Sequence, residues 1–279
     1  MEAFMKAILA RILGGMGYTL ARNSSIAALN AAAARGRDLD FLATMPDEHV
    51  AELLKLLPLS HSQLRQDLFV LSELGLKRGG YFVEFGAASG KELSNTWLLE
   101  KHFGWNGILA EPAKCWHQSL AANRSCAIEH RCVWKSTGDS LDFAEASEAE
   151  ISTLTPFKGG DQHAASRRSS RHYQVETISL SDLMAEHKAP DNPDYLSIDT
   201  EGSELEILQA FDFKRHPFKV ITCEHNFTPA REKIHGLLTA AGYVRKYEKI
   251  SDFDDWYVRT RGSTQVSVTA SSRRSAAPS

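Results

Sequence analysis

The sequence predicts an α/β fold built on a mostly parallel sheet. From residue 81 onward, short apolar runs alternate with stretches of helical periodicity, which is the order typical of such a sheet. The first run, 81–85, leads into a turn that contains Gly86 and Gly90. Strand, glycine turn and helix together commonly hold nucleotide-like cofactors. The turn lacks GxGxxG and GxxxxGKS/T, so both the dinucleotide fingerprint and the P-loop fit poorly.

Composition limits the functional classes. The 279 residues suit one sizeable domain with extensions, or two small ones, and 43% hydrophobic residues are enough for a large core. The net charge of −3 gives no general reason to expect nucleic acid as a partner. The cysteines are scattered without a CxxC pair, which fits a reducing compartment, so we expect a cytoplasmic protein. Residues 1–20 are mildly amphipathic, which would allow weak contact with a membrane surface, although a helix packed on its own domain is the simpler interpretation.

Residues 1–60 are predicted to form a helical extension without catalytic residues. Its first helix is rich in alanine and is expected to end near Gly36. A second helix begins after Pro46 and ends at Pro58, and a third covers 62–75. The apolar face of the second helix is formed by Val50, Leu53, Leu54 and Leu57.

The main domain is expected to cover residues 61–260. Its predicted strands are 81–85, 107–110, 128–134, 175–178, 194–198 and 219–223, with 243–247 and 255–259 as a final antiparallel pair. Predicted helices follow the second, fifth and sixth strands, at 113–122, at 201–211 and after the capping residue Thr228.

Two polar segments complete the chain. Residues 138–174 are irregular apart from a small hairpin near 141–143, and the part 159–172 resembles a mobile lid or a disordered insertion. The tail 261–279 is rich in Ser, Thr, Ala and Arg and is expected to be disordered.

Four predicted strands end in polar or acidic residues. These residues are Glu84, Glu111, Asp199 and the group formed by Glu224, His225 and Asn226. In an open parallel sheet the ligand crevice lies beyond the carboxyl ends of the strands, so these side chains should gather along one edge. A single polar residue after a strand is often only solvated or capping, but four such ends beside a glycine turn indicate a functional site.

Glu111 follows the glycine turn by about one βαβ step. An acidic side chain at that point can accept two hydrogen bonds from ribose hydroxyls, which predicts an adenosine ligand more than a particular reaction. The alternative is a carboxylate that caps the 113–122 helix. Glu84 would hold the cofactor's amino group directly or through water, or would be a buried carboxylate paired with a main-chain N–H.

These motifs carry a resemblance to a known family. From about Gln63 to Arg259 the chain resembles the FkbM family of S-adenosylmethionine-dependent methyltransferases. The matching segments include VEFGAASG (83–90), GWNGILAEP (104–112), DYLSIDTEGSE (194–204) and CEHN (223–226). The resemblance implies a Rossmann-like class I methyltransferase fold, a seven-stranded sheet with helices on both faces. It also implies O-methylation, often of sugars or other secondary-metabolite hydroxyls. Ser89 stands where family members often carry Asp, and a serine there can still cap the following helix.

The resemblance and the strand ends together define an expected cofactor site for S-adenosylmethionine. Adenine is expected near 131–134, where main-chain groups often bind it. The expected cofactor-binding residues are Glu84, Gly86, Ala88, Gly90, Asn95, Glu111, Pro112, Cys132, Val133 and Asp199.

Methyl transfer to oxygen also requires that the hydroxyl proton be removed, by a general base or with the help of a metal. Asp199, Glu224 and Asn226 offer oxygen ligands that would suit Mg²⁺. Without a metal, His225 is the first choice as base, since its ordinary pKa suits proton transfer near neutrality; an imidazole that only fixes the loop is the alternative. The candidate catalytic residues are therefore Asp199, His225 and Glu224.

Glu201 and Glu204 follow Asp199 and extend this acidic run. Glu201 is expected to face the site, and Glu204 is expected to bond nearby N–H groups.

Two other functions remain open from the residues. A nicotinamide-dependent oxidoreductase could use the same sheet, but its fingerprint is missing and hydride transfer does not need the acidic ends at 199 and 224. A non-catalytic adenosine-ligand-binding protein could keep the fold, but it would not need the complete set of carboxylates. The expected acceptor is a hydroxyl of a glycan or small molecule, and no nucleic acid is expected.

Overall fold

The computed structural model describes Gly15, residues 22–146, Ala149, and residues 152–157 and 170–260. The amphipathic segment 1–20 apart from Gly15, the tail 261–279 and most of the 159–172 loop lie outside the described residues. Within the described part, none of the helices combines the length and the apolar character that crossing a membrane requires.

A seven-stranded, mostly parallel sheet forms the centre of the molecule, as predicted. Its order is β10-β11-β9-β8-β1-β2-β3, and β11 alone runs antiparallel to the other strands. The strands are β1 (Tyr81–Phe85), β2 (Asn106–Ala110), β3 (Ala127–Glu129), β8 (Tyr195–Ile198), β9 (Val220–Glu224), β10 (Tyr243–Lys246) and β11 (Asp254–Arg259). The parallel strands are buried on both faces, which explains their nearly continuous apolar sequences.

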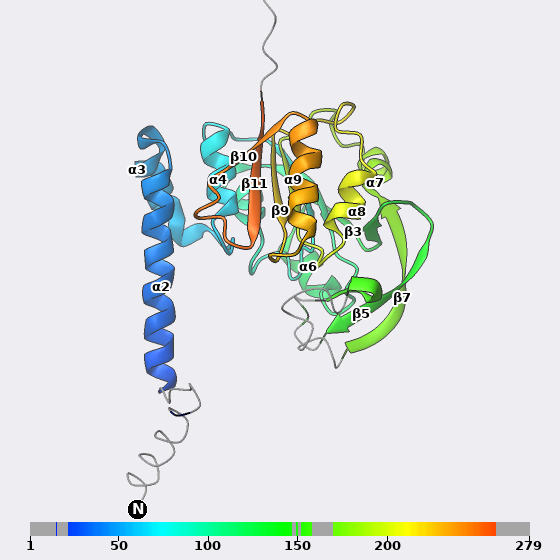
Figure 1. The fold of residues 1–279 in the computed structure, drawn as a ribbon, viewed down its shortest axis with the longest axis horizontal. Coiled ribbons are helices and arrows are strands. Elements are labelled where there is room, and N and C mark those ends of the chain that lie inside the picture. Colours follow the sequence, from blue (N-terminus) through cyan, green and yellow to red (C-terminus); the bar gives the residue numbers. More distant parts are fainter. Residues whose placement is uncertain (1–14, 16–21, 147–148, 150–151, 158–169, 261–279) are drawn as a thin grey trace, which may run out of the picture.

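Helices cover both faces of this sheet (Figure 1). One face packs on α4 (Gln66–Glu73), α5 (Trp97–Phe103) and α6 (His117–Asn123), and the other packs on α7 (Leu180–Glu186), α8 (Glu204–Gln209) and α9 (Ala230–Ala240). Along β1, Phe82 contributes to the first core, whereas Val83 and Phe85 contribute to the second. The period of two along the strand therefore separates the two layers.

A second sheet was not predicted. Four strands in the order β4-β7-β5-β6 form it: β4 (Cys132–Trp134), β5 (Ser140–Ala146), β6 (Thr153–Leu154) and β7 (Ser170–Ser179). The predicted single strand 128–134 is wrong, because β3 and β4 belong to different sheets. Strand β3 ends at Glu129, whose carboxylate accepts a 2.9 Å hydrogen bond from the Arg131 main-chain N–H and so stabilises a turn before β4. The irregular segment predicted from 138 is instead a long ladder between β5 and β7, and Thr155–Phe157 form a short 3-10 helix (η3).

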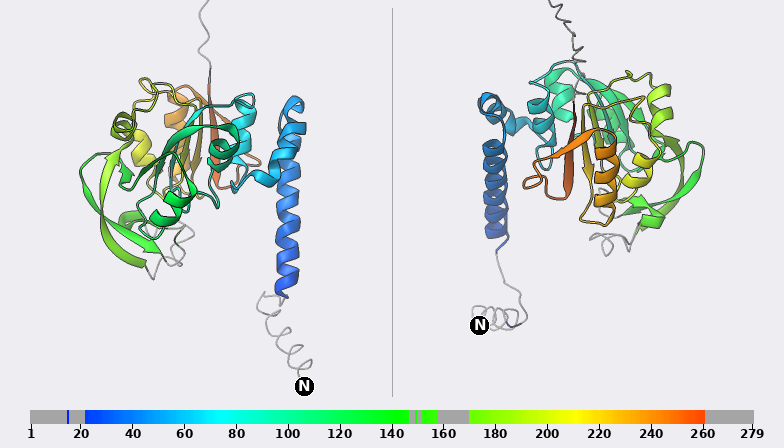
Figure 2. Two further views of the ribbon diagram at one scale, coloured as in Figure 1. Left: turned by 180° about the vertical axis from the view of Figure 1, so that it is seen from behind. Right: turned by 45° about the horizontal axis from the view of Figure 1, so that its top comes forward.

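The N-terminal helix α2 (Asn23–Thr44) stands beside the domain on the side away from the second sheet (Figures 1 and 2). The predicted end at Gly36 is wrong, because α2 continues through Gly36 to Thr44. A β carbon at Gly36 would meet open space, so nothing packs against the helix at that point. The helix ends one residue before Met45, whose extended backbone is the conformation that the following Pro46 imposes. Only Phe41 and Leu42 of α2 are buried.

Helix α3 (Asp47–Leu56) begins after Pro46, as predicted, and Leu57–Leu59 continue it as a short 3-10 helix (η1). Leu53 and Leu56 point into the core, but Leu54 is 56% exposed, so its assignment to the apolar face was wrong. The third helix starts at Gln66 and not at residue 62, since Arg65 has a left-handed backbone with φ of 69°.

Candidate active site

The glycine turn after β1 lies against the end of β8. Gly86 has a φ of 72°, and a β carbon at this position would lie 1.9 Å from the Asp199 main-chain oxygen. Gly90 has a φ of 74°, and its β carbon would lie 2.5 Å from a methyl carbon of Leu120. Both positions therefore require glycine, for conformation and for space. The turn is held close to the strand ends that carry the acidic residues.

Glu84 is buried and bonded entirely within the protein. Its carboxylate accepts hydrogen bonds from the Asn95 main-chain N–H at 2.7 Å and from the hydroxyls of Ser94 and Thr96. The buried Arg124 guanidinium lies 3.7 Å away. Burial raises the pKa of Glu84 despite the opposing effects of Arg124 and these hydrogen bonds. These contacts match the alternative of a buried carboxylate paired with a main-chain N–H, and Glu84 lines neither of the cavities described below.

Glu111 stands at the end of β2, beside the glycine turn. One carboxylate oxygen accepts a 2.8 Å hydrogen bond from the Ala88 main-chain N–H, and the other accepts one of equal length from Ala113. The pKa of Glu111 is raised to about 7, mainly because the side chain is buried; the two main-chain bonds oppose this rise, and the nearby Asp199 adds to it. Each carboxylate oxygen keeps a further lone pair for a ligand hydroxyl.

A cavity, here called the adenosine cavity, lies between the glycine turn and the second sheet. Its walls come from the ends of β1, β2, β4 and β8 and include Gly86, Ala88, Glu111, Pro112, Cys132, Val133 and Asp199. Sequence reasoning missed Trp116 and Phe143, which also line it. The buried indole Nε1–H of Trp116 has no acceptor among the described residues. An unpaired donor in this wall fits a ligand that carries hydrogen-bond acceptors, as adenine does.

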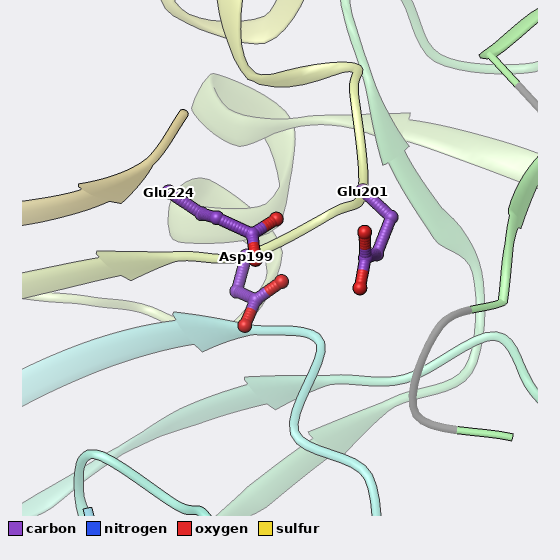
Figure 3. A group of neighbouring side chains, drawn as sticks. All are labelled: Asp199, Glu201 and Glu224. Atoms are coloured by element: carbon purple, nitrogen blue, oxygen red, sulfur yellow. The ribbon is translucent and has the colours of Figure 1, made fainter. Parts of the chain in front are cut away.

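A second cavity, the acceptor cavity, opens on the other side of the glycine turn. Asn95, Asp199, Glu201, Glu224 and Asn226 line it together with Gln63 and Gln66. Figure 3 shows how the carboxylates of Asp199, Glu201 and Glu224 project from the ends of β8 and β9 and the loop after β8. One oxygen of each lies within 4.8 Å of the others. Asp199 and Glu201 line both cavities, so these two carboxylates lie where the cavities meet, and Glu224 lies in the wall of the acceptor cavity.

The family model for the methyltransferase FkbM domain matches residues 84–258, which is more than half of the chain. The chain belongs to the FkbM methyltransferase family. Its cofactor is thereby S-adenosylmethionine, and the features of the adenosine cavity fit that molecule: a carboxylate with spare lone pairs and an indole N–H without an acceptor. Membership also favours the methyltransferase interpretation over a nicotinamide-dependent oxidoreductase.

The comparison with solved structures gives matches at low identity, two of which are proteins named as methyltransferases. An FkbM methyltransferase from Methylobacillus flagellatus KT matches with 14% identity and a TM-score of 0.43, over 80% of this chain and 58% of that protein. A TehB-like SAM-dependent methyltransferase from Corynebacterium glutamicum matches with 8% identity and a TM-score of 0.38, over 77% and 97% of the two chains. A search of curated proteins found no match. At these low TM-scores, the family assignment rests on the matching family model.

The carboxylates of this FkbM protein repel one another. Burial, Asp199 and Glu201 together raise the pKa of Glu224 far above its ordinary value. Asp254 lies opposite Glu224 in the β9–β11 ladder, and burial raises its pKa to about 8. Asp254 was not singled out in the sequence, because its side chain falls at the start of an antiparallel strand and no motif marks it.

His225 is not brought to the acceptor cavity by the structure. Its Nδ1 accepts a 3.0 Å hydrogen bond from the Phe227 main-chain N–H, and its Nε2 lies 3.7 Å from the Asp255 carboxylate. Because Glu224 and His225 are adjacent along an extended chain, their side chains leave it on opposite sides. These contacts match the alternative of an imidazole that fixes the loop, and burial lowers the pKa of His225.

The remaining predicted residues either line the acceptor cavity or hold neighbouring groups in place by hydrogen bonds. Asn226 donates a 3.2 Å hydrogen bond from its amide nitrogen to the Glu201 carboxylate, so it orients that side chain. The Glu204 carboxylate accepts bonds from the main-chain N–H groups of Thr200 and Gly202, which confirms its expected structural role. Asn95 lines the acceptor cavity and donates a 3.0 Å bond from its side chain to Ser197.

Proposed function

We propose that this FkbM protein transfers a methyl group from S-adenosylmethionine to a hydroxyl oxygen of a sugar or a related polyhydroxylated metabolite. The observation that carries the proposal is the place of the three carboxylates. Asp199 and Glu201 line both cavities, and Glu224, in the wall of the acceptor cavity, has a carboxylate oxygen within 4.8 Å of theirs. A group that accepts a proton is needed there, because an alcohol must lose its proton as its oxygen takes the methyl group.

The cofactor's place follows from the donors and acceptors of the adenosine cavity. Glu111 would accept hydrogen bonds from the ribose hydroxyls, while Trp116 and the main chain of β4 would contact the adenine. The glycine turn, with Gly86 and Ala88 in the walls of both cavities, would face the amino-acid end. Bound S-adenosylmethionine supplies an electrophilic methyl group on a positively charged sulfur. The nearby carboxylates favour that positive charge.

Where no cation is bound, Glu224 is the best-supported proton acceptor. A general base works best when its pKa lies near the working pH, and burial with neighbouring carboxylates moves the pKa of Glu224 upward from its ordinary value. Asp199 lies against the glycine turn, since a β carbon at Gly86 would strike its main-chain oxygen. It would position the acceptor hydroxyl and balance the charge of the sulfonium.

The proposal includes a divalent cation held by Asp199, Glu201 and Glu224. Three carboxylate oxygens within 4.8 Å of one another form a donor set of the kind that Mg²⁺ prefers. A cation there would relieve the mutual repulsion that raises the pKa of Glu224 and would lower the pKa of a bound hydroxyl. Asn226, expected from the sequence as the third ligand, donates to Glu201, so Glu201 takes its place in the set.

Three measurements test this function. Calorimetric titration should show binding of S-adenosylmethionine and none of NAD. A screen of glycans with radiolabelled methyl donor should then yield labelled products, with the modified hydroxyl mapped on each. If the protein binds no S-adenosylmethionine at millimolar concentration, the non-catalytic alternative is correct. Activity that persists unchanged in a chelator, with no gain on adding Mg²⁺, would remove the cation from the proposal and leave Glu224 as the base.

A further inference from the structure

A third cavity lies between helix α2 and the domain, and the proposed function does not use it. Its walls come from three segments that are far apart in the sequence: the second half of α2, the turn at 63–65 and the turn at 249–252. Phe41, Leu64 and Ile250 contribute apolar surface, and charged side chains stand around them. We call it the α2 cavity.

The α2 cavity adjoins the acceptor cavity. Gln63 lines both of them, and it is exposed, so its side chain reaches solvent at their shared border. Leu64, the next residue, belongs to the wall of the α2 cavity, and Phe253, which follows the 249–252 turn, belongs to that of the acceptor cavity. A ligand that occupies the acceptor cavity can therefore continue past Gln63 toward α2.

The walls of the α2 cavity are fixed by specific contacts. Arg65 makes a two-pronged ion pair with Asp38 of α2, at 2.8 and 3.2 Å, and donates a 3.1 Å hydrogen bond to the Ser60 main-chain oxygen. The ring of Phe41 packs edge-on against Trp256 of β11, with centroids 6.5 Å apart. Arg65 and Asp252 both hold left-handed backbones, with φ of 69° and 51°. Such a conformation is costly for an arginine, whereas an aspartate tolerates it.

The polar groups of the α2 cavity are available to a ligand. Arg37, Asp40, Lys249 and Asp252 line it, and the side chains of these four make no ion pair or hydrogen bond with any residue that the structure describes. Three cationic and three anionic side chains line the cavity in all: Arg37, Arg65 and Lys249, with Asp38, Asp40 and Asp252. The formal charges cancel, so the cavity suits a neutral ligand that both donates and accepts hydrogen bonds. A phosphorylated acceptor would need an excess of cations.

We propose that the α2 cavity is a second acceptor subsite, which binds the sugar ring next to the one that is methylated. Apolar surface surrounded by mixed donors and acceptors fits a pyranose ring, whose faces carry C–H groups and whose edge carries hydroxyls. The acceptor is then a neutral glycan of two or more rings, and α2 is part of the substrate-binding surface. This inference rests on the proposed function.

The test compares acceptors of different length. p-Nitrophenyl glycosides of one, two and three rings, sharing the terminal ring found in the glycan screen, are assayed for kcat/KM with radiolabelled methyl donor. Acceptors of two rings should exceed the one-ring acceptor in kcat/KM by at least about tenfold. In the double variant Arg37→Ala with Lys249→Ala, the ratio of the two values should fall toward one.

A matched control variant also removes one arginine and one lysine, but at positions outside the cavity. Arg35 lies on α2 and Lys233 on α9, both are exposed, and neither lines the α2 cavity. The double variant Arg35→Ala with Lys233→Ala should keep the full preference for two rings. Equal kcat/KM for one and two rings, or an unchanged ratio in the Arg37–Lys249 variant, would overturn the subsite and leave the methyltransferase proposal intact. If S-adenosylmethionine binds but no glycan of any length is methylated, both proposals are wrong.

Discussion

The side-chain amide of Gln66 in α4 donates a 2.7 Å hydrogen bond to the carboxyl group of Asp254 in β11, across 188 positions of sequence. Gln66 also lines the acceptor cavity, and Asp254 stands opposite Glu224 in the sheet. The bond thus ties the wall of the acceptor cavity to the edge of the acidic cluster. Its carboxyl partner has a pKa of about 8, because it is buried among other acidic groups.

Stability should therefore fall as pH rises from about 4 to about 8. The raised pKa of Asp254 means that the folded state keeps a proton that the unfolded chain releases near pH 4, and each such group contributes up to ~1.4 kcal/mol per pH unit. Glu111 and Asp67, each with a pKa raised by burial to about 7, act in the same direction. Asp254→Asn should flatten the pH dependence of the free energy of unfolding, measured by urea denaturation. Asp252→Asn, an exposed change nearby, should not. Parallel curves for wild type and Asp254→Asn would contradict the raised pKa.

Glu111→Gln should weaken binding of S-adenosylmethionine about 10- to 100-fold. The change removes the negative charge that strengthens bonds from the ribose hydroxyls, and a hydrogen bond to a charged group contributes about 1.5–3 kcal/mol. Calorimetric titration measures the Kd directly. Glu176→Gln, which neutralises an exposed carboxylate on β7, serves as the control and should bind normally. An unchanged Kd in Glu111→Gln would mean that the ribose lies elsewhere.

Substitution of Glu224 should reduce methyl transfer strongly, whereas substitution of His225 should reduce it little. Glu224→Gln should reduce methyl transfer at least about 100-fold with little change in cofactor affinity, since a general base contributes about 10²–10⁴ in rate. His225→Asn should keep most activity, because an amide oxygen can replace Nδ1 as the acceptor for the Phe227 N–H. Single-turnover assays with radiolabelled donor separate the two. A folded His225→Asn protein as inactive as Glu224→Gln would restore the histidine as base.

Gly86→Ala should be far more destabilising than Gly138→Ala. Both glycines have positive φ, at 72° and 89°, but a β carbon at Gly86 would strike the Asp199 main chain whereas one at Gly138 meets open space. Gly138→Ala should cost about 1–2 kcal/mol from backbone strain alone. Gly86→Ala should cost more by at least ~1–3 kcal/mol, because the overpacked backbone must also move. Urea denaturation measures both, and equal losses would show that strain alone requires glycine at Gly86.

The central sheet could be predicted because its strands are chemically distinctive. The runs at 81–85, 107–110, 194–198 and 219–223 are apolar on both faces, which few other elements require. The helices were predicted to start too early, at 113 and 201, because the residues after each strand are used in the site. Glu111 and Glu204, for example, accept hydrogen bonds from main-chain N–H groups within these segments and so hold them as turns ahead of each helix. Helical periodicity alone does not report such turns.

The candidate site could be predicted only in part. Strand ends indicated Glu111, Asp199 and Glu224, and the structure places all three in the cavity walls. Their roles stay predictions. The second sheet was not predicted because β5 and β7 are polar on their exposed face, so Phe143 could not be placed in the wall of the adenosine cavity. The direction of His225 depends on where β9 ends, and a shift of one residue reverses it.

The VEFG motif suggested Glu84 as a cofactor-binding residue, but the contacts of Glu84 in the structure are structural ones. Its carboxylate is committed to Ser94, Asn95, Thr96 and Arg124, so the chain would need it in order to fold even if it never met a methyl donor. Under the proposed function, a relative that lost catalysis would no longer need Glu224, whose carboxyl is buried among acidic neighbours. It would keep VEFG intact. The sequence of β1 should therefore identify members of the family whether or not they are active. The residues at the end of β9 should distinguish active enzymes from inactive relatives.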